Sequence, residues 1–95
     1  MQVYYLLRSK ADGSYLVARL NNDEAVKTAS YLLMFNEHFD ALSYLNTHGK
    51  GISDRFAVES IAATQISNLM QRWGFQGVGI VQDPILPNIE FLAKS

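Results

Sequence analysis

The chain has 95 residues, of which 48% are hydrophobic and 18% charged, and its formal net charge at pH 7 is −1. This size and composition are typical of one folded domain with a buried core, and they exclude an intrinsically disordered chain. The nearly balanced charge gives no strong attraction for nucleic acid or an anionic membrane, and the absence of cysteine excludes disulfides, thiolate metal sites and a cysteine nucleophile.

The start of the chain does not have the pattern of a signal peptide. The apolar run at residues 3–7 is interrupted by Arg8 and Lys10, and no stretch of the sequence reaches the ~18 apolar residues of a membrane span. These features predict a soluble, cytoplasmic protein that does not bind membranes.

Two strand patterns open the chain. Residues 3–7 are β-branched, aromatic and aliphatic, and they lead to a turn at Asp12-Gly13, where glycine accepts a positive φ. Residues 15–20 follow as the second arm of a predicted hairpin.

Residues 25–35 allow two interpretations. A helix capped by Asp23 could run through them, or residues 31–35 could form a buried strand after a loop. Five consecutive bulky apolar residues leave no polar face for a helix to present to water, so we favour the strand.

Two segments have a helical period. The first is predicted from an Asn36 cap to a stop at Gly49. Its expected inward stripe consists of Phe39, Ala41, Leu42 and Leu45. The second is predicted between Thr64 and Gly74. Its apolar residues follow the i, i+3, i+4, i+7 pattern of one helix face: Ile66, Leu69, Met70 and Trp73.

Three further strands are predicted at residues 55–61, 78–81 and 89–93, the last two joined by a loop between Pro84 and Pro87. The resulting order is β-β-β-α-β-α-β-β. It predicts a single two-layer α+β domain over residues 1–95, with a mixed sheet and two helices on one face. Each helix is expected to connect parallel strands through a right-handed crossover.

One family resemblance rests on two stretches. The strand at residues 31–35 leads directly into Glu37-His38-Phe39-Asp40-Ala41-Leu42, and a helix that ends at Gly74 leads into residues 78–84. This pattern resembles the N-terminal domain of the enhanced-serine-sensitivity (SseB-like) proteins, and it is similar in style to small bacterial and cyanobacterial proteins. The resemblance implies an interaction module and transfers no catalytic residue.

No motif in the sequence assigns a chemistry. His38 and His48 lie about 80° apart around one helix and roughly 15 Å apart along it, so they cannot share a metal within one chain. Gly74, Gly77 and Gly79 follow a helix rather than precede one, which is the wrong order for a phosphate-binding loop. Nucleophile signatures such as Gly-x-Ser-x-Gly are absent. We predict no catalytic residue, no metal and no cofactor, although an enzyme activity is left open.

The strands at residues 3–7 and 31–35 are apolar at both alternating positions, a pattern typical of strands covered on both faces. Two short helices on one face would leave the other face bare. A second copy or another protein could close it, or Ile85, Leu86 and residues 25–26 could fold over it.

We therefore predict a non-catalytic protein–protein interaction module that forms a homodimer or binds a protein partner, and that does not bind nucleic acid. Its expected binding residues are Tyr4, Tyr15, Tyr31, Ile85 and Leu86. The alternative is a small-ligand-binding regulatory domain, with a pocket between the sheet and the loop at residues 83–88.

Overall fold

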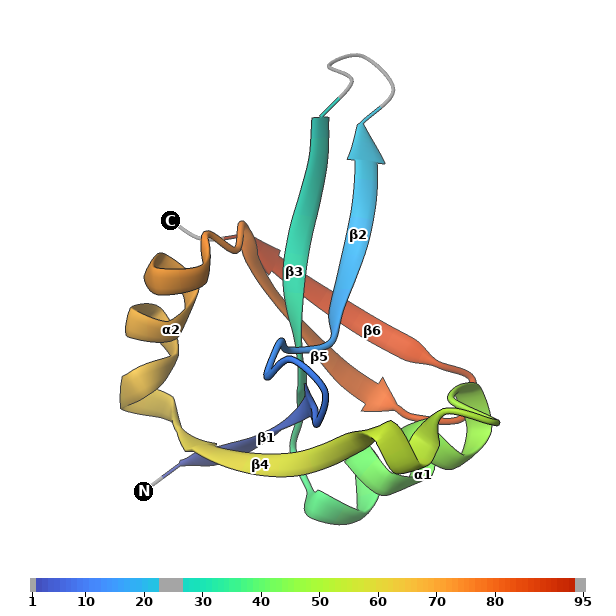
Figure 1. Cartoon of the computed structure of the whole chain (residues 1–95). Coiled ribbons are helices and arrows are strands. Elements are labelled where there is room, and N and C mark those ends of the chain that lie inside the picture. Colours follow the sequence, from blue (N-terminus) through green and yellow to red (C-terminus); the bar gives the residue numbers. More distant parts are fainter. Residues whose placement is uncertain (1, 23–26, 94–95) are drawn as a thin grey trace.

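The computed structural model describes residues 2–22 and 27–93 (Figure 1). Its elements, in chain order, are β1 (Val3–Ser9), β2 (Val17–Asn22), β3 (Lys27–Phe35), α1 (His38–His48), β4 (Phe56–Ala62), α2 (Ile66–Trp73), β5 (Gly77–Asp83) and β6 (Asn88–Ala93). Short 3₁₀ turns at Ser53–Arg55 and Ala63–Gln65 flank β4. The α+β class and the predicted order of elements are confirmed, and residues 31–35 form a strand; residues 25–26 lie outside the described chain.

The strands form one mixed sheet in the order β4-β1-β3-β5-β6, with β2 as an additional partner of β3. β3 and β5 are parallel, whereas the other described pairs are antiparallel. One edge of β3 is shared by two strands, because β1 meets it at Tyr5 opposite Phe35 and β2 pairs with its earlier residues. β2 and β3 consequently extend as a two-stranded ribbon away from β1 and β4 (Figure 1).

This topology corrects two expectations about pairing. The predicted hairpin of residues 3–7 with 15–20 reduces to a single bridge between Arg8 and Tyr15, because β2 pairs with β3 instead. The strands on either side of each helix are not neighbours either: β4 lies antiparallel to β1 at one end of the sheet.

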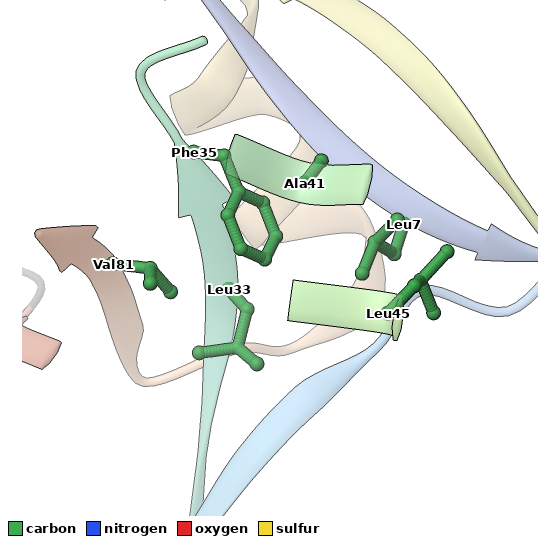
Figure 2. Close-up of a cluster of buried hydrophobic side chains, with 6 residues drawn as sticks. All are labelled: Leu7, Leu33, Phe35, Ala41, Leu45 and Val81. Carbon is green, nitrogen blue, oxygen red and sulfur yellow. The ribbon is translucent and has the colours of Figure 1, made fainter. Parts of the chain in front are cut away.

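The two helices cover opposite faces of the sheet. One buried cluster joins α1 to the sheet and consists of Leu7, Leu33, Phe35, Ala41, Leu45 and Val81 (Figure 2). The other joins α2 to the sheet and consists of Leu6, Leu32, Met34, Ile66 and Val78. Because successive residues of a strand point to opposite faces, the strand members of these clusters lie on the two sides of the same strands. The prediction of two helices on one face is therefore wrong.

One helix on each face also removes the bare sheet face that the sequence suggested. Leu6 and Leu7 are neighbours on β1 that point to opposite faces, and both are 0% exposed. The strands that are apolar at both positions, β1 and β3, are central and are covered on both sides, as such strands usually are. Any surplus apolar surface must lie elsewhere in the molecule.

Of the four α1 residues that were predicted to face the core, two are buried and two are exposed. Ala41 and Leu45 are buried, but Phe39 is 74% exposed and Leu42 is 41% exposed. Residues two apart on a helix point about 200° apart, so Phe39 faces solvent once Ala41 faces the core. The helix begins after Glu37 rather than Asn36, and no side chain caps its start.

The ends of the helices are set by two glycines, at the positions predicted. Gly74 follows α2 with φ 72°, the left-handed conformation that favours glycine. Gly49 follows α1 with φ −107°, and a Cβ there would lie 2.9 Å from the carbonyl oxygen of Leu45. At the start of α2, Gln65 occupies the cap position and Thr64 belongs to the preceding 3₁₀ turn.

Candidate functional site

A polar cluster lies on the α2 face, where Arg8 of β1 and Glu59 of β4 are diagonal neighbours. Nη1 of Arg8 donates to Oε2 of Glu59 at 3.1 Å, and the Tyr15 hydroxyl donates to Oε1 at 3.0 Å. Nε of Arg8 donates to the carbonyl oxygen of Gly13 at 2.8 Å, and the guanidinium lies 5.0 Å from the centre of the Tyr15 ring. Both oxygens of the carboxylate are thus occupied by partners within the chain.

The electrostatics of this cluster keep its donors protonated. Burial raises the pKa of the Tyr15 phenol, and the hydrogen bond to Glu59 raises it further. The same carboxylate raises the pKa of Arg8 through its hydrogen bond. A phenol with a raised pKa is a poor general base near neutral pH, so the arrangement is suited to joining β1, β4 and the loop before β2 rather than to proton transfer.

Aromatic side chains extend the polar cluster toward the end of α2. The Tyr15 and Trp73 rings meet edge to face with centroids 5.5 Å apart, and Trp73 stacks on Phe75 at 6.3 Å. Tyr4 and Tyr15 both pack against the buried cluster that joins α2 to the sheet. Two of the predicted binding residues, Tyr4 and Tyr15, therefore lie together beneath α2, where they are half-buried and contribute to the core.

Tyr31 lies on the other face of the sheet, half-buried, with its ring edge to face against Phe91 at 5.4 Å. Its position beside Gly77 places it where β3 and β5 begin their parallel pairing. It is thus separated from Tyr4 and Tyr15 by the sheet, and it supports a residue of β6.

Ile85 and Leu86 lie in the loop between β5 and β6 and are 62% and 77% exposed. The loop is held by Asp83, whose Oδ1 accepts from the backbone N–H of Ile85 at 2.9 Å and of Leu86 at 3.2 Å. Nε2 of His48 lies 2.9 Å from the carbonyl oxygen of Pro84, which fixes the loop against the end of α1. The five predicted residues therefore occupy three separate places.

Two grooves meet at Leu16, which precedes β2, and Phe56, which begins β4. The larger has a volume of about 480 Å³, is widely open, and is lined by Ser9, Ser14, Tyr15, Leu16, Val17, Arg19 and Phe56. The smaller, about 120 Å³, lies beneath the end of α1 and is lined by Leu16, Tyr44, Leu45, His48, Gly49, Ile52 and Phe56. Burial raises the pKa of the Tyr44 phenol. Neither groove involves residues 83–88, where the ligand-binding alternative placed its pocket, and neither encloses a ligand as typical small-molecule sites do.

Grouped metal ligands and buried polar atoms without a partner mark chemical sites, and the structure describes residues 2–22 and 27–93. Within these ranges no three His, Asp or Glu side chains are grouped so that they could hold a metal ion, and no buried side-chain nitrogen or oxygen lacks a hydrogen-bond partner. Neither described helix has the length and apolar character needed to cross a membrane. The described chain therefore holds no buried polar side chain that a ligand would be needed to satisfy.

The edge strand β6 carries the apolar surface that the sequence interpretation missed. Phe91 is 38% exposed and Leu92 is 46% exposed. Phe91 is opposite Gly79 and Leu92 is opposite Val78, so the two side chains lie on the α1 and α2 faces respectively. The outer edge of β6 pairs with no strand of the described chain. The sequence signal was present, since residues 89–93 are apolar on both faces apart from Glu90, but the edge position depends on the topology.

Comparisons of the chain with known protein families, curated proteins and solved structures found no match. The chain's own surface is therefore what bears on its function. On that surface, the polar cluster is internally satisfied and the grooves are open, whereas the edge of β6 offers unpaired backbone together with exposed apolar side chains.

Proposed function

We propose that this protein is a non-catalytic, cytoplasmic protein–protein interaction module that associates with a second copy of itself. The observation that carries the proposal is the free edge of β6, with Phe91 and Leu92 exposed on its two faces. The resemblance of residues 31–42 and 74–84 to the SseB-like domain points in the same direction and stays a prediction.

The physical reason is that the backbone hydrogen-bonding groups along a free strand edge have no partner strand. Its outward N–H and C=O groups can pair with another chain, and each Å² of apolar surface removed from water contributes about 25 cal/mol. Proteins that stay monomeric commonly protect such edges with lysine, proline or a bulge. The strand Asn88–Ala93 contains neither lysine nor proline, and its register shift with β5 falls at its first pair, Asp83 with Asn88.

The polar cluster supports a non-catalytic reading. Each oxygen of the Glu59 carboxylate already accepts a hydrogen bond within the chain, one from Arg8 and one from Tyr15. These bonds engage the carboxylate in joining β1, β4 and the loop before β2, which supports a structural role rather than general-base catalysis.

A small anionic ligand is the second candidate, favoured by the position of Arg19 along the 480 Å³ groove. A ligand that binds the folded state raises the melting temperature by mass action. Thermal denaturation with inorganic phosphate and with short-chain carboxylates tests this candidate. A saturable rise that Arg19→Ala abolishes would favour it over the interaction module.

Sedimentation velocity over a range of protein concentrations tests the proposed self-association. The expected result is a shift from the monomer mass of 10.7 kDa toward twice that value as concentration rises from about 1 µM to several hundred µM. A monomer throughout this range would contradict the proposal.

A further inference from the structure

β4 and β6 end the five-strand row β4-β1-β3-β5-β6, and β2 is a further strand that pairs on one side only; the free edges of β4 and β6 differ in chemistry. The exposed residues of β4 are small or polar, Ala57 and Ser60, and its Glu59 is held by Arg8. On β6, by contrast, Phe91 and Leu92 are large, apolar and exposed. α1 packs mainly on β1, β3 and β4, and His48 at its end holds the loop that precedes β6. Of the two edges, that of β6 is therefore the more apolar.

The backbone identifies the kind of partner that fits this edge. An edge strand presents N–H and C=O groups at a fixed spacing along an extended line, and another extended strand satisfies them together. A strand of the same sequence is always available at the same concentration as β6. Pairing two identical strands antiparallel creates a two-fold contact, which closes after two copies instead of growing into a fibre.

The geometry points to a homodimer in which β6 pairs antiparallel with β6 of a second copy, about a two-fold axis at Phe91. The two sheets then form one continuous sheet across the dimer. This inference rests on the proposed self-association and specifies the surface and the register through which it occurs.

The register follows from charge and from the limits of the strand. Two identical antiparallel strands are related by a two-fold axis perpendicular to the sheet. Opposite residues in such a pair point to the same face, so the axis passes between a residue and the same residue of the second copy. An axis at Glu90 would place two carboxylates directly opposite each other, which is unfavourable. An axis at Ile89 would bring the turn residue Pro87, which has no N–H, opposite Phe91.

An axis at Leu92 would pair only residues 91–93 of the strand, whereas an axis at Phe91 avoids these conflicts and pairs residues 89–93 of both strands. The two Phe91 rings face each other on the α1 face, and Glu90 faces Leu92 of the other copy on the α2 face. Phe91 is already held edge to face against Tyr31 at 5.4 Å. Because this contact orients the ring before association, little side-chain entropy is lost when the strands pair.

Single cysteine variants test the register directly, since the natural chain contains no cysteine. Directly opposite residues have Cβ atoms about 4.5–5.5 Å apart, close to the separation that a disulfide spans. Under mild oxidation with diamide, which takes up the two electrons and two protons of a thiol pair, Phe91→Cys should give a covalent dimer. A mixture of Glu90→Cys and Leu92→Cys should cross-link at least fivefold more than either variant alone. Ile85→Cys, in the exposed loop, is the matched control and should stay monomeric on a denaturing gel.

The outcomes separate this inference from the proposed function. If the protein sediments as a dimer but the mixed variants cross-link no better than Ile85→Cys, the β6 register is wrong and self-association through another surface stands. If the protein sediments as a monomer and no variant cross-links, the proposed function is itself contradicted. The mixture does not alter Phe91, so a folding defect of Phe91→Cys would not affect it.

Discussion

At the scale of single residues, Gly79 is a position where the structure needs the absence of a side chain. A Cβ there would lie 3.1 Å from side-chain carbons of Leu33, Ile89 and Phe91 at once. Leu33 is 2% exposed, so core residues surround it on nearly all sides. The glycine lets β3 and β6 pack closely across β5, and it allows the ring of Phe91 to reach Tyr31 on the α1 face.

Gly79→Ala should therefore destabilise the fold, although alanine is otherwise better than glycine in a strand. Overpacking of this kind costs about 1–3 kcal/mol, and we expect a loss near 1 kcal/mol in the free energy of unfolding. Urea denaturation measures it, with Gln82→Ala at an exposed position of β5 as the control. If the variant were as stable as the natural protein or more stable, the three neighbouring side chains would have moved to make room for the methyl group, and the prediction would be wrong.

The raised pKa of Tyr15 gives a prediction about alkaline pH. Burial and the Glu59 hydrogen bond favour the protonated phenol, so the folded state holds this proton at a pH where the unfolded state has lost it. The unfolded state then binds fewer protons, and the free energy of unfolding falls as pH rises above the ordinary tyrosine pKa of 10.0.

Tyr15→Phe should lessen this alkaline loss and lower stability by about 1 kcal/mol at neutral pH, where the hydrogen bond to Glu59 is removed. Denaturation curves at pH 7 and at several values above 10 measure both effects. Burial also raises the pKa of Tyr44. Tyr44 therefore lowers the free energy of unfolding at alkaline pH in the natural protein and in the variant alike. An unchanged pH dependence in the variant would contradict the assignment to Tyr15.

At the scale of elements, α1 buries a narrow stripe and leaves much of its apolar surface in water. Ala41 and Leu45 contact the sheet, whereas Phe39 and Leu42 face outward. The apolar pattern alone could not distinguish these pairs, since both fit one turn of a helix. The direction in which the helix meets the sheet decides which pair is covered.

Leu45→Ala and Leu42→Ala are matched substitutions that test this orientation. Removing a buried leucine side chain costs about 2–5 kcal/mol, so Leu45→Ala should lie in that range. Leu42→Ala should cost less than about 1 kcal/mol, because the side chain is already 41% exposed. Equal losses in urea denaturation would mean that α1 is rotated about its axis relative to this description.

The elements themselves could be predicted because their signals are local. Residues 31–35 form a strand and residues 66–73 a helix, as their periodicity indicates, and Gly49 and Gly74 follow the two helices. Strand pairing joins residues far apart in sequence, so local patterns could not show that β4 lies beside β1 or that β2 lies beside β3. The side of the sheet on which each helix lies depends on that pairing.

The candidate site was predicted only in part for the same reason. The exposure of Ile85 and Leu86 follows from their place between two prolines, a local feature. Phe91 and Leu92 have no distinguishing local pattern, and they become a candidate surface because β6 is at the end of the sheet. The tyrosines of β1 and β3 resemble a binding face in sequence, yet both faces of those strands are covered.

At the scale of the whole molecule, the helices shelter the middle of the sheet from both sides and leave an apolar edge. The mixed sheet order places β1, β3 and β5 inside and β6 outside. Association through β6 would extend the sheet along this apolar edge.

Sedimentation equilibrium of charge variants at Leu92 tests this claim most directly. In the proposed register Leu92 faces Glu90 of the other copy, so Leu92→Glu should weaken the dimer at least tenfold, by loss of apolar contact and by repulsion between carboxylates. Leu92→Lys, which meets that carboxylate with the opposite charge, should dissociate less than Leu92→Glu, and Ile85→Glu should dimerise like the natural protein. Dimerisation of Leu92→Glu with unchanged affinity, or dissociation caused by Ile85→Glu instead, would contradict the account.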